Sequence, residues 1–379
     1  MGVIYADNAA TTRLSDTAFD AMKPYMLNEY GNASTLYKLG RSAHKAVENA
    51  RGVFAKGINA LPAEIYFTSG GTESDNWAIK GTAHRLAASG KKHIVTDNIE
   101  HHAVLNSAKA LEREGFEVTY VRADKNGLVR AEDVAAAIRP DTALVSVMFA
   151  NNELGTIQPV EEIGSICRSE GVLFHCDAVQ AAGILPIDVK AMNIDLLSIS
   201  AHKFHGPKGV GVMYARRGCV PETYIDGGEQ ERGHRAGTEN VAGIVGAAAA
   251  FAEAMSERDE KAERLCAMRD EIQSGLLKIP GSQVNGVTAP RLPGTLNMSF
   301  DGIDGQLLIF ELDLKGLAAS SGSACASGSV DPSHVLLALG LPYKLAHGSL
   351  RLSLGKYNTS DEAEKIIRIV SDTVAELRG

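Results

Sequence analysis

Residues 172–202, VLFHCDAVQAAGILPIDVKAMNIDLLSISAH, contain the pattern that decides the fold. Two short apolar runs, 172–179 and 195–202, are separated by a segment about as long as one β-α-β crossover. Strands joined in this way run parallel and usually lie side by side. The stretch therefore predicts two neighbouring parallel strands, and we expect Asp177 and Lys203 at their ends, about 5 Å apart.

Similar apolar or β-branched runs occur on the N-terminal side of this stretch, at 64–69, 92–97, 116–124 and 142–150. They alternate with segments of helical periodicity. A further run, 209–217, follows too soon for a crossover helix and is expected to pair antiparallel. The pattern predicts an α/β fold with a mostly parallel seven-stranded sheet and helices on both faces.

The alternation of apolar runs with helical segments ends at about residue 256. A long charged helix, several short strands and a final helix are expected there, which together indicate a smaller α+β domain. A chain of 379 residues is long enough for two domains. We predict a large domain at 14–255 and a small domain formed by 1–13 and 256–379.

Composition and charge limit the class of protein. Hydrophobic residues make up 45% of the chain, charged residues 22%, and the net charge is −8. A disordered chain, a membrane protein, and a protein attracted by charge to nucleic acid or lipid are therefore not expected. The most apolar window, 241–255, is too short for a membrane span and predicts a buried helix.

The N-terminal sequence lacks the pattern of a secretory signal, so a cytoplasmic location is expected. The cysteines show no metal-ligand spacing and are expected to be reduced thiols. The chain has five of them, Cys167, Cys176, Cys219, Cys266 and Cys325.

Ligands of open parallel sheets bind outside the carboxyl ends of the strands. A glycine-containing loop that opens a helix can receive a phosphate there, a lysine can bond to an aldehyde, and a carboxylate can pair with a pyridinium nitrogen. These are the needs of pyridoxal phosphate. The predicted strand ends carry Gly71, Thr72, His101, His102, Asn151, Asn152, Asp177, Gln180, Ser200, His202 and Lys203.

Each of these residues also has a simpler interpretation. Asp177 alone could cap a helix, and Lys203 alone could be a solvated lysine, with Lys208 as a rival for its role. His202 and His205 could suggest a metal pair, but no third ligand is evident, so we predict no metal site. The cofactor hypothesis depends on the coincidence of several such residues at one edge of the sheet.

Several segments carry a resemblance to a known family: FTSGGTESDN (67–76), HCDAVQ (175–180), SISAHKFHGPKGVG (198–211), ERGHRAGTEN (231–240) and SSGSACASGSVDPSHVL (320–336). They resemble the cysteine desulfurases of the NifS/IscS group, in the class V aminotransferase family. The match runs from YADNAATT at 5–12 to RLSLG at 351–355, nearly the whole chain. The GNASTLY segment departs from the family pattern at Ala33 and Tyr37, and we assign no chemistry to it.

The resemblance implies a fold type I pyridoxal phosphate-dependent transferase that forms a homodimer, with the cofactor in the large domain. Lys203 would bond to the cofactor aldehyde, Asp177 would pair with the pyridinium nitrogen, and Gln180 would meet the ring hydroxyl. His101 would stack on the ring and assist proton transfer. The phosphate would be held by Thr72, Ser200, His202 and, from the other subunit, Thr238.

The resemblance also implies a substrate and a reaction. Arg351, supported by Asn152, would bind the carboxylate of L-cysteine. Cys325, as a thiolate in a small glycine- and serine-rich loop, would take the substrate sulfur as a persulfide and leave alanine. The sulfur would pass to an acceptor protein, of a scaffold type for iron-sulfur cluster assembly or of a tRNA-thiolation type.

Two other classes of function remain open at this point. A selenocysteine lyase or an aminotransferase could use the same fold, because fold alone does not determine reaction. A non-catalytic scaffold protein is also conceivable, although it would have no need of Lys203. Neither nucleic acid nor membrane is expected as a direct partner.

Overall fold

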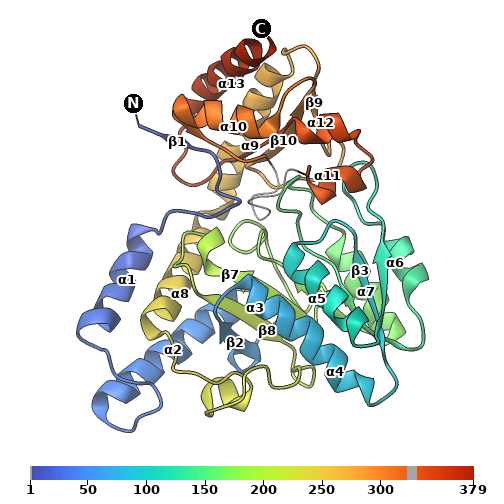
Figure 1. The fold of residues 1–379 in the computed structure, drawn as a ribbon. Coiled ribbons are helices and arrows are strands. Elements are labelled where there is room, and N and C mark those ends of the chain that lie inside the picture. The colour runs from blue at the N-terminus through green and yellow to red at the C-terminus, as the bar shows by residue number, and fades with distance from the viewer. Residues whose placement is uncertain (1, 322–330) are drawn as a thin grey trace.

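The computed structural model describes residues 2–321 and 331–379, which form a large part and a smaller part above it (Figure 1). The large part is built on a seven-stranded sheet. In spatial order the strands are β2 (Ile65–Thr68), β8 (Gly211–Ala215), β7 (Leu196–Ser200), β6 (Leu173–Asp177), β5 (Thr142–Ser146), β3 (His93–Asp97) and β4 (Glu117–Val121). Only β8 runs antiparallel to its neighbours, β2 and β7. The predicted mostly parallel sheet, including its antiparallel run, is confirmed.

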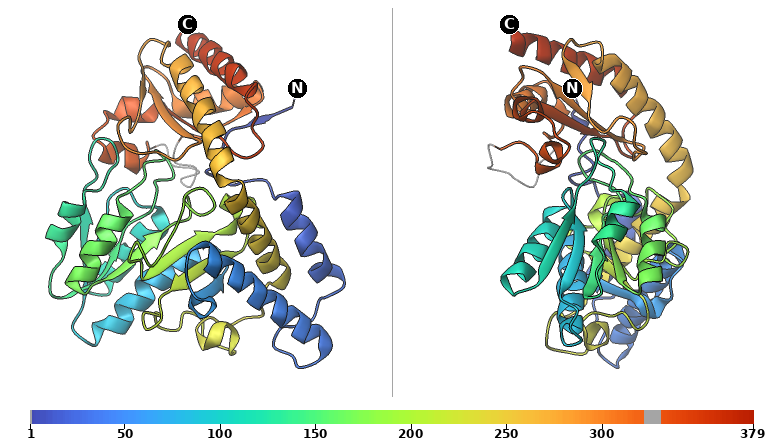
Figure 2. Two further views of the ribbon diagram at one scale, coloured as in Figure 1. Left: turned by 180° about the vertical axis from the view of Figure 1, so that it is seen from behind. Right: turned by 90° about the vertical axis from the view of Figure 1, so that its right-hand side faces the viewer.

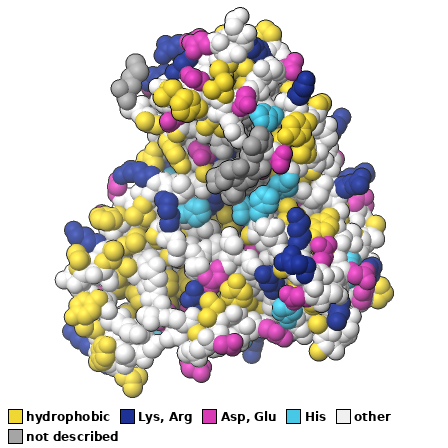
Figure 3. All heavy atoms as spheres, viewed as in Figure 1, with side chains coloured by type: hydrophobic (Ala, Val, Ile, Leu, Met, Phe, Trp, Pro, Cys, Tyr) yellow, Lys and Arg dark blue, Asp and Glu magenta, His cyan; other side chains and the backbone are white. Residues whose placement is uncertain are grey.

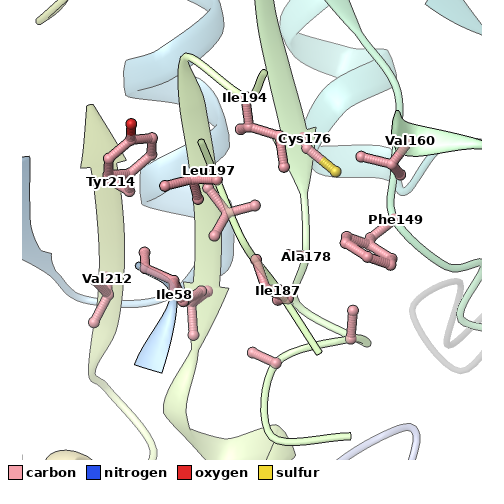
Figure 4. Packing of buried hydrophobic residues seen from close by; sticks show 14 of the residues in the cluster. Ile58, Phe149, Val160, Cys176, Ala178, Ile187, Ile194, Leu197, Val212 and Tyr214 are labelled. Atoms are coloured by element: carbon pink, nitrogen blue, oxygen red, sulfur yellow. The ribbon is translucent and has the colours of Figure 1, made fainter. Parts of the chain in front are cut away.

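Alternate residues of the strands pack on opposite faces of this sheet, as a pleated strand requires. Ile94 and Leu196 belong to one buried cluster, together with Trp77 from a covering helix. Their neighbours Val95 and Leu197 belong to the larger cluster on the other face. Figure 4 shows part of that larger cluster, around residues of β6, β7 and β8. Because both faces are apolar, both need a layer of helices.

Helices cover both faces, as predicted. One face is covered by α3 (Gly71–Asn76), its continuation through the π-helix η2 (Trp77–Gly81) into α4 (Thr82–Ala87), and α5 (His102–Arg113). The other face is covered by α2 (Lys38–Gly57), α6 (Ala131–Ala137), α7 (Val160–Glu170) and α8 (Val241–Ser256), and α1 (Asp16–Leu27) packs on α8. The predicted buried helix at 241–255 is therefore α8.

The connection between β6 and β7 differs from the expected crossover. The two strands are parallel neighbours, and Asp177 lies opposite Ser198. Residues 178–195 form turns without a regular helix. Gly183 and Asn193 have positive φ angles of 74° and 52°, in the left-handed region that interrupts a helix. The predicted pairing of the two strands is confirmed. The helix implied by the β-α-β spacing does not form.

The small part contains a three-stranded antiparallel sheet of β12 (Ser349–Ser353), β10 (Thr295–Phe300) and β9 (Ser282–Val284). Beside it, β1 (Ile4–Tyr5) pairs in parallel with β11 (Leu317–Ala318). The helices of this part are α9 (Arg258–Leu276), α10 (Gly305–Leu314) and α13 (Glu362–Arg378). Its own buried cluster includes side chains from all three helices. The chain thus begins in the small part and descends to α1 in the large one (Figure 2).

Two short helices, α11 (His334–Ala338) and α12 (Tyr343–His347), link the parts. Val335 and Leu336 belong to the buried cluster of the large part. We therefore propose two domains divided close to residues 13 and 255, with α11 and α12 as a contact between them. Within the described residues, no helix has the length and apolar character needed to cross a membrane.

Candidate active site

A cavity of about 320 Å³ opens where the carboxyl edge of the large sheet meets the small part. Thr238, which was predicted for the site, is exposed and does not line this cavity. Cys325 lies outside the described residues. Asn151, a further strand-end candidate, is buried and does not line the cavity. The other residues to which a role was assigned all line it: Gly71, Thr72, His101, Asn152, Asp177, Gln180, Ser200, His202, Lys203 and Arg351.

Asp177 is the last residue of β6 and is 6% exposed. Its position in the strand directs the side chain to the face that α3 covers, since its neighbour Cys176 packs into the cluster on the other face. Its Oδ1 accepts a hydrogen bond of 2.8 Å from the Val179 N–H. Burial raises the pKa of Asp177 to about 6, although this hydrogen bond and the charge of Lys203 oppose the rise. A cation placed beside this carboxyl would favour its charged form.

Lys203 ends the short turn Ala201–Lys203 that follows β7. Its Nζ lines the cavity and donates hydrogen bonds to the carbonyl oxygens of Ala9 and Ala10. Lys208, the rival lysine, lies on the rim of a shallower hollow beside the cavity rather than in it. Of the two lysines, only Lys203 reaches the centre where the other predicted residues meet.

Two histidines of the cavity are neutral at neutral pH. Burial, followed by the charge of Lys203, lowers the pKa of His101 to about 4, and the same two causes lower that of His202 to about 4. His101 precedes α5 and caps it, because its Nδ1 accepts the Ala103 N–H. The ring proton of neutral His101 is therefore on Nε2. A flat neutral ring of this kind can stack on an aromatic cofactor and also donate a hydrogen bond from Nε2.

The part of the cavity lined by Gly71, Thr72 and Ser200 has the chemistry of a phosphate site. Gly71 and Thr72 open the helical segment that begins with α3, and Ser200 adds a hydroxyl. A Cβ atom at Gly71 would lie 2.6 Å from Val179 Cγ2, so any larger residue there would require Val179 to move. The shallower hollow shares these three residues and brings in the positive charge of Lys208.

Sequence reasoning missed a buried polar layer behind Asp177. Asp75 lines the cavity at 1% exposure, and burial, followed by the charge of Asp177, raises its pKa well above the usual value. The Ser198 hydroxyl bonds to Asp75 and lies 3.0 Å from His175 Nε2. Burial lowers the pKa of His175 to about 3. Helical spacing from Gly71 and strand spacing from Asp177 would have placed Asp75 and His175 on this face.

The small part contributes the last wall of the cavity. Arg351, in β12, is 1% exposed and donates from Nη2 to Asp7 Oδ1 at 2.8 Å and from Nη1 to the Asn152 carbonyl at 3.0 Å. Glu153 is buried and accepts a hydrogen bond from Ser333 Oγ, which also caps α11. Sequence reasoning identified Arg351 and Asn152 but not their partners.

Histidines gather at this wall. The rings of His102 and His334 lie 4.7 Å apart, and His334 Nε2 is 3.1 Å from the Glu100 carbonyl. Figure 3 shows histidine side chains in the middle of this face, between the two parts of the molecule. Across residues 2–321 and 331–379, no three His, Cys, Asp or Glu side chains are grouped to hold a metal ion.

The four cysteines in the described ranges are free thiols. Cys167, Cys176 and Cys219 are buried, and burial raises the pKa of each, that of Cys167 to about 12. A buried thiol of raised pKa is a poor nucleophile because little of it is thiolate. The environment of these three cysteines is therefore that of unreactive core residues, and the expected free thiols are confirmed for the described cysteines.

Comparison with known proteins identifies the family. The model of the family described as aminotransferase class-V matches residues 4–366. The chain belongs to the class V aminotransferase family. The chain is 50% identical over 375 residues to a relative from Methanosarcina thermophila named "Cysteine desulfurase IscS", and the match covers 99% of this chain and 93% of the relative. A relative of the same name from Clostridium botulinum is 49% identical over 378 residues, covering 99% and 95%.

Solved structures agree with this assignment. A structure titled "NIFS-LIKE PROTEIN" is 40% identical, with a TM-score of 0.93, and the match covers 99% of this aminotransferase family member and 100% of that chain. A structure titled "SspA in complex with cysteine" is 36% identical, with a TM-score of 0.83, and the match covers 94% and 99%. The resemblance to cysteine desulfurases drawn from the sequence motifs is confirmed.

Proposed function

We propose that this protein is a pyridoxal phosphate-dependent cysteine desulfurase, which converts L-cysteine to L-alanine and passes on the sulfur. The observation that carries the proposal is the meeting of Lys203, Asp177, His101 and Arg351 in one cavity. Relatives about 50% identical over nearly the whole chain, all named cysteine desulfurase, support the choice of substrate.

The residues of the cavity fit pyridoxal phosphate. Asp177 is a buried carboxyl whose charged form would be stabilised by a cation such as a protonated ring nitrogen, and Gly71, Thr72 and Ser200 line the cavity where a phosphate would bind. When bound, the cofactor supplies an aldehyde for an amino group and a ring that withdraws electrons. Lys203 would bond to the aldehyde and His101 would lie on the ring face. Gln180 would meet the ring hydroxyl, and its Nε2 is already oriented by the Ala9 carbonyl at 3.1 Å.

The phosphate would be bound by Thr72, Ser200 and His202 at the glycine end of the cavity. Thr238 is exposed and outside this cavity, which suits a side chain that completes the site of a second copy. The proposal therefore includes a homodimer in which each subunit lends Thr238 to the other. We also propose that the protein works in the cytoplasm.

Arg351 would hold the substrate carboxylate, and Asn152 would support it. The guanidinium has the planar geometry that a carboxylate needs, and its buried position excludes water from the contact. The Nε2–H of neutral His101 would donate a hydrogen bond beside the reacting atoms and so assist proton transfer there. With its carboxylate held by Arg351 and the cofactor held by Asp177 and Lys203, the substrate has one orientation in the cavity.

Cys325 would accept the sulfur. Its thiolate attacks the substrate sulfur, an S–S bond forms as the C–S bond breaks, and the electron pair stays with the carbon fragment, which takes up protons and leaves as alanine. The terminal sulfur of the persulfide then passes to the thiolate of an acceptor protein, of a scaffold type for iron-sulfur cluster assembly or of a tRNA-thiolation type.

The test is the mass of the Cys325 peptide after brief incubation of the cofactor-loaded protein with L-cysteine, without reducing agent. We expect a gain of one sulfur atom that a reducing thiol reverses and that does not form in Lys203→Ala. Alanine without the added sulfur would mean that Cys325 is not the acceptor. The absence of both would favour a selenocysteine lyase or an aminotransferase, and selenocysteine and other amino acids would then be tried as substrates.

A further inference from the structure

The N-terminal segment, residues 4–12, lies between β11 and β12, and β12 carries Arg351. On one side, β1 pairs with β11, and the Ala6 N–H continues this pairing to the Ala318 carbonyl. On the other side, the Ala6 carbonyl accepts a 2.7 Å hydrogen bond from the N–H of Ser353 in β12. The segment then reaches Lys203 through the carbonyls of Ala9 and Ala10. It is therefore a structural part of the cavity wall.

Asp7 is the residue of this segment that contacts Arg351. The Nη2–Oδ1 distance is 2.8 Å, and the side chains are 2% exposed for Arg351 and 18% for Asp7. The Asn152 carbonyl accepts a hydrogen bond from the other terminal nitrogen, Nη1. Two acceptors on two different nitrogens prevent the planar guanidinium from turning about its long axis.

We propose that Asp7 is a positioning residue for Arg351, and that it sets the orientation in which the guanidinium receives a substrate carboxylate. The inference rests on the proposed function, since it deepens the role of Arg351. A guanidinium held in one plane presents its N–H groups to a carboxylate at no further entropic cost. The N-terminal segment is thus part of substrate recognition, although it lies 344 residues from Arg351 in the sequence.

The negative charge of Asp7 has an effect on substrate binding that opposes its positioning of Arg351. Because the two effects change KM in opposite directions, the inference can be tested. A carboxylate beside Arg351 repels the substrate carboxylate, so removing it could strengthen binding if Arg351 kept its position. A loosened guanidinium loses the two-point geometry on which carboxylate recognition depends. Because Arg351 is almost fully buried and has Asp7 as its ion-pair partner, we expect the loss of orientation to dominate.

The test compares Asp7→Ala with Asp7→Asn in the cofactor-loaded protein. We measure KM and kcat for L-cysteine, and calorimetric binding of L-alanine, which carries the carboxylate but no sulfur. Asp7→Ala should raise KM, and the dissociation constant of L-alanine, about tenfold, with kcat changed less than about threefold. Asp7→Asn should recover most of this loss, because its amide oxygen still accepts from Nη2 while its charge is absent.

Asn8→Ala is the matched control from the same segment. Asn8 donates to the Ser353 carbonyl at 2.9 Å and does not contact Arg351, so this variant reports on docking of the segment alone. It should change KM less than about twofold. Cysteamine, which lacks a carboxylate, should bind Asp7→Ala and the unaltered protein alike.

Three outcomes would overturn the inference. An unchanged or lower KM in Asp7→Ala would mean that Asp7 only competes with the substrate. Equal losses in Asp7→Ala and Asp7→Asn would mean that its charge, and not its hydrogen bond, matters. An equal loss in Asn8→Ala would reduce the effect to docking of the segment. L-alanine binding is read without turnover, so the inference can be judged even if no sulfur is transferred from L-cysteine.

Discussion

The two walls of the cavity are built in different ways. The wall formed by the sheet takes Asp177, Ser200 and Lys203 from the end of a strand or the turn after it. The wall formed by the small part takes Arg351 from the middle of a strand and joins it to Asp7, 344 residues away. The first wall follows from a rule of topology, and the second depends on contacts between distant segments. We therefore expect the sheet wall to control the chemistry and the small-part wall to control substrate binding.

The largest effect is expected from Lys203→Ala in the sheet wall. Without this amine the protein cannot bond to the cofactor aldehyde, and alanine production should fall at least about a thousandfold. The measurement is steady-state alanine formation from L-cysteine with added cofactor. Loss of turnover in Lys208→Ala, with retention in Lys203→Ala, would assign the role to the other lysine.

The next largest effect, a fall in kcat/KM, is expected from Asp177→Asn. It is compared with the same substitution at the neighbouring buried carboxyl, Asp75. Asp177→Asn removes the charge proposed to pair with the ring nitrogen and should lower kcat/KM about a hundredfold. Asp75→Asn should change it less than about threefold, because burial raises the pKa of Asp75 and so favours its neutral form, which an amide resembles. The visible absorbance of the bound cofactor should shift in the first variant alone. A larger loss in Asp75→Asn would show that Asp75, and not Asp177, carries the working charge.

A smaller effect on chemistry is expected in the small-part wall. Arg351→Ala removes the proposed carboxylate partner and should raise KM for L-cysteine about thirtyfold or more, with a lesser fall in kcat. The measurement is the dependence of rate on L-cysteine concentration. An unchanged KM would place the carboxylate site elsewhere, and a fall in kcat alone would give this wall a role in chemistry.

The smallest effect is expected on the free energy of unfolding and involves Asp97, a buried carboxyl of the large sheet. Asp97 ends β3, its Oδ1 accepts the Ile99 N–H, and burial raises its pKa to about 7. As pH rises from 4 to 7, this carboxyl ionises in the unfolded chain but not in the folded one, so it progressively lowers the free energy of unfolding. Asp97→Asn cannot ionise and keeps the acceptor.

The difference in Tm between Asp97→Asn and the unaltered protein should therefore rise by a few degrees between pH 4 and pH 7 and level off above that. Thermal unfolding followed by circular dichroism at each pH is the measurement. A difference that is constant with pH would mean that Asp97 has an ordinary pKa.

The sheet was largely predictable because its signals are local. Runs such as 195–202 and 209–217 became β7 and β8, including the antiparallel direction of β8. The turns of 178–195 were not predictable as such, since strand pairing requires a connection but does not require a helix. Strands as short as β1, with two residues, carry no periodicity of their own and form only against a partner such as β11.

The residues of the cavity likewise divide into those that the sequence predicted and those that it did not. The strand-end rule brought Asp177, Ser200 and Lys203 together without any structure, because parallel strands end at one edge. Asp75 and Glu153 were missed because an acidic residue in a sequence is usually solvated. Only the tertiary structure shows that both are buried, Asp75 beside Asp177 and Glu153 against Ser333.

The sequence by itself thus determined the parallel sheet, the edge at which the cavity lies, many of the residues that line this cavity and, through its motifs, the family. The tertiary structure alone decided which residues of the small part face that edge, that Asp7 and Asn152 both contact Arg351, and which carboxyls have a raised pKa. The physical reason is the separation along the chain of the residues on which each property depends. Backbone periodicity and strand direction are local properties, whereas an ion pair and a burial-shifted pKa depend on packing between segments hundreds of residues apart.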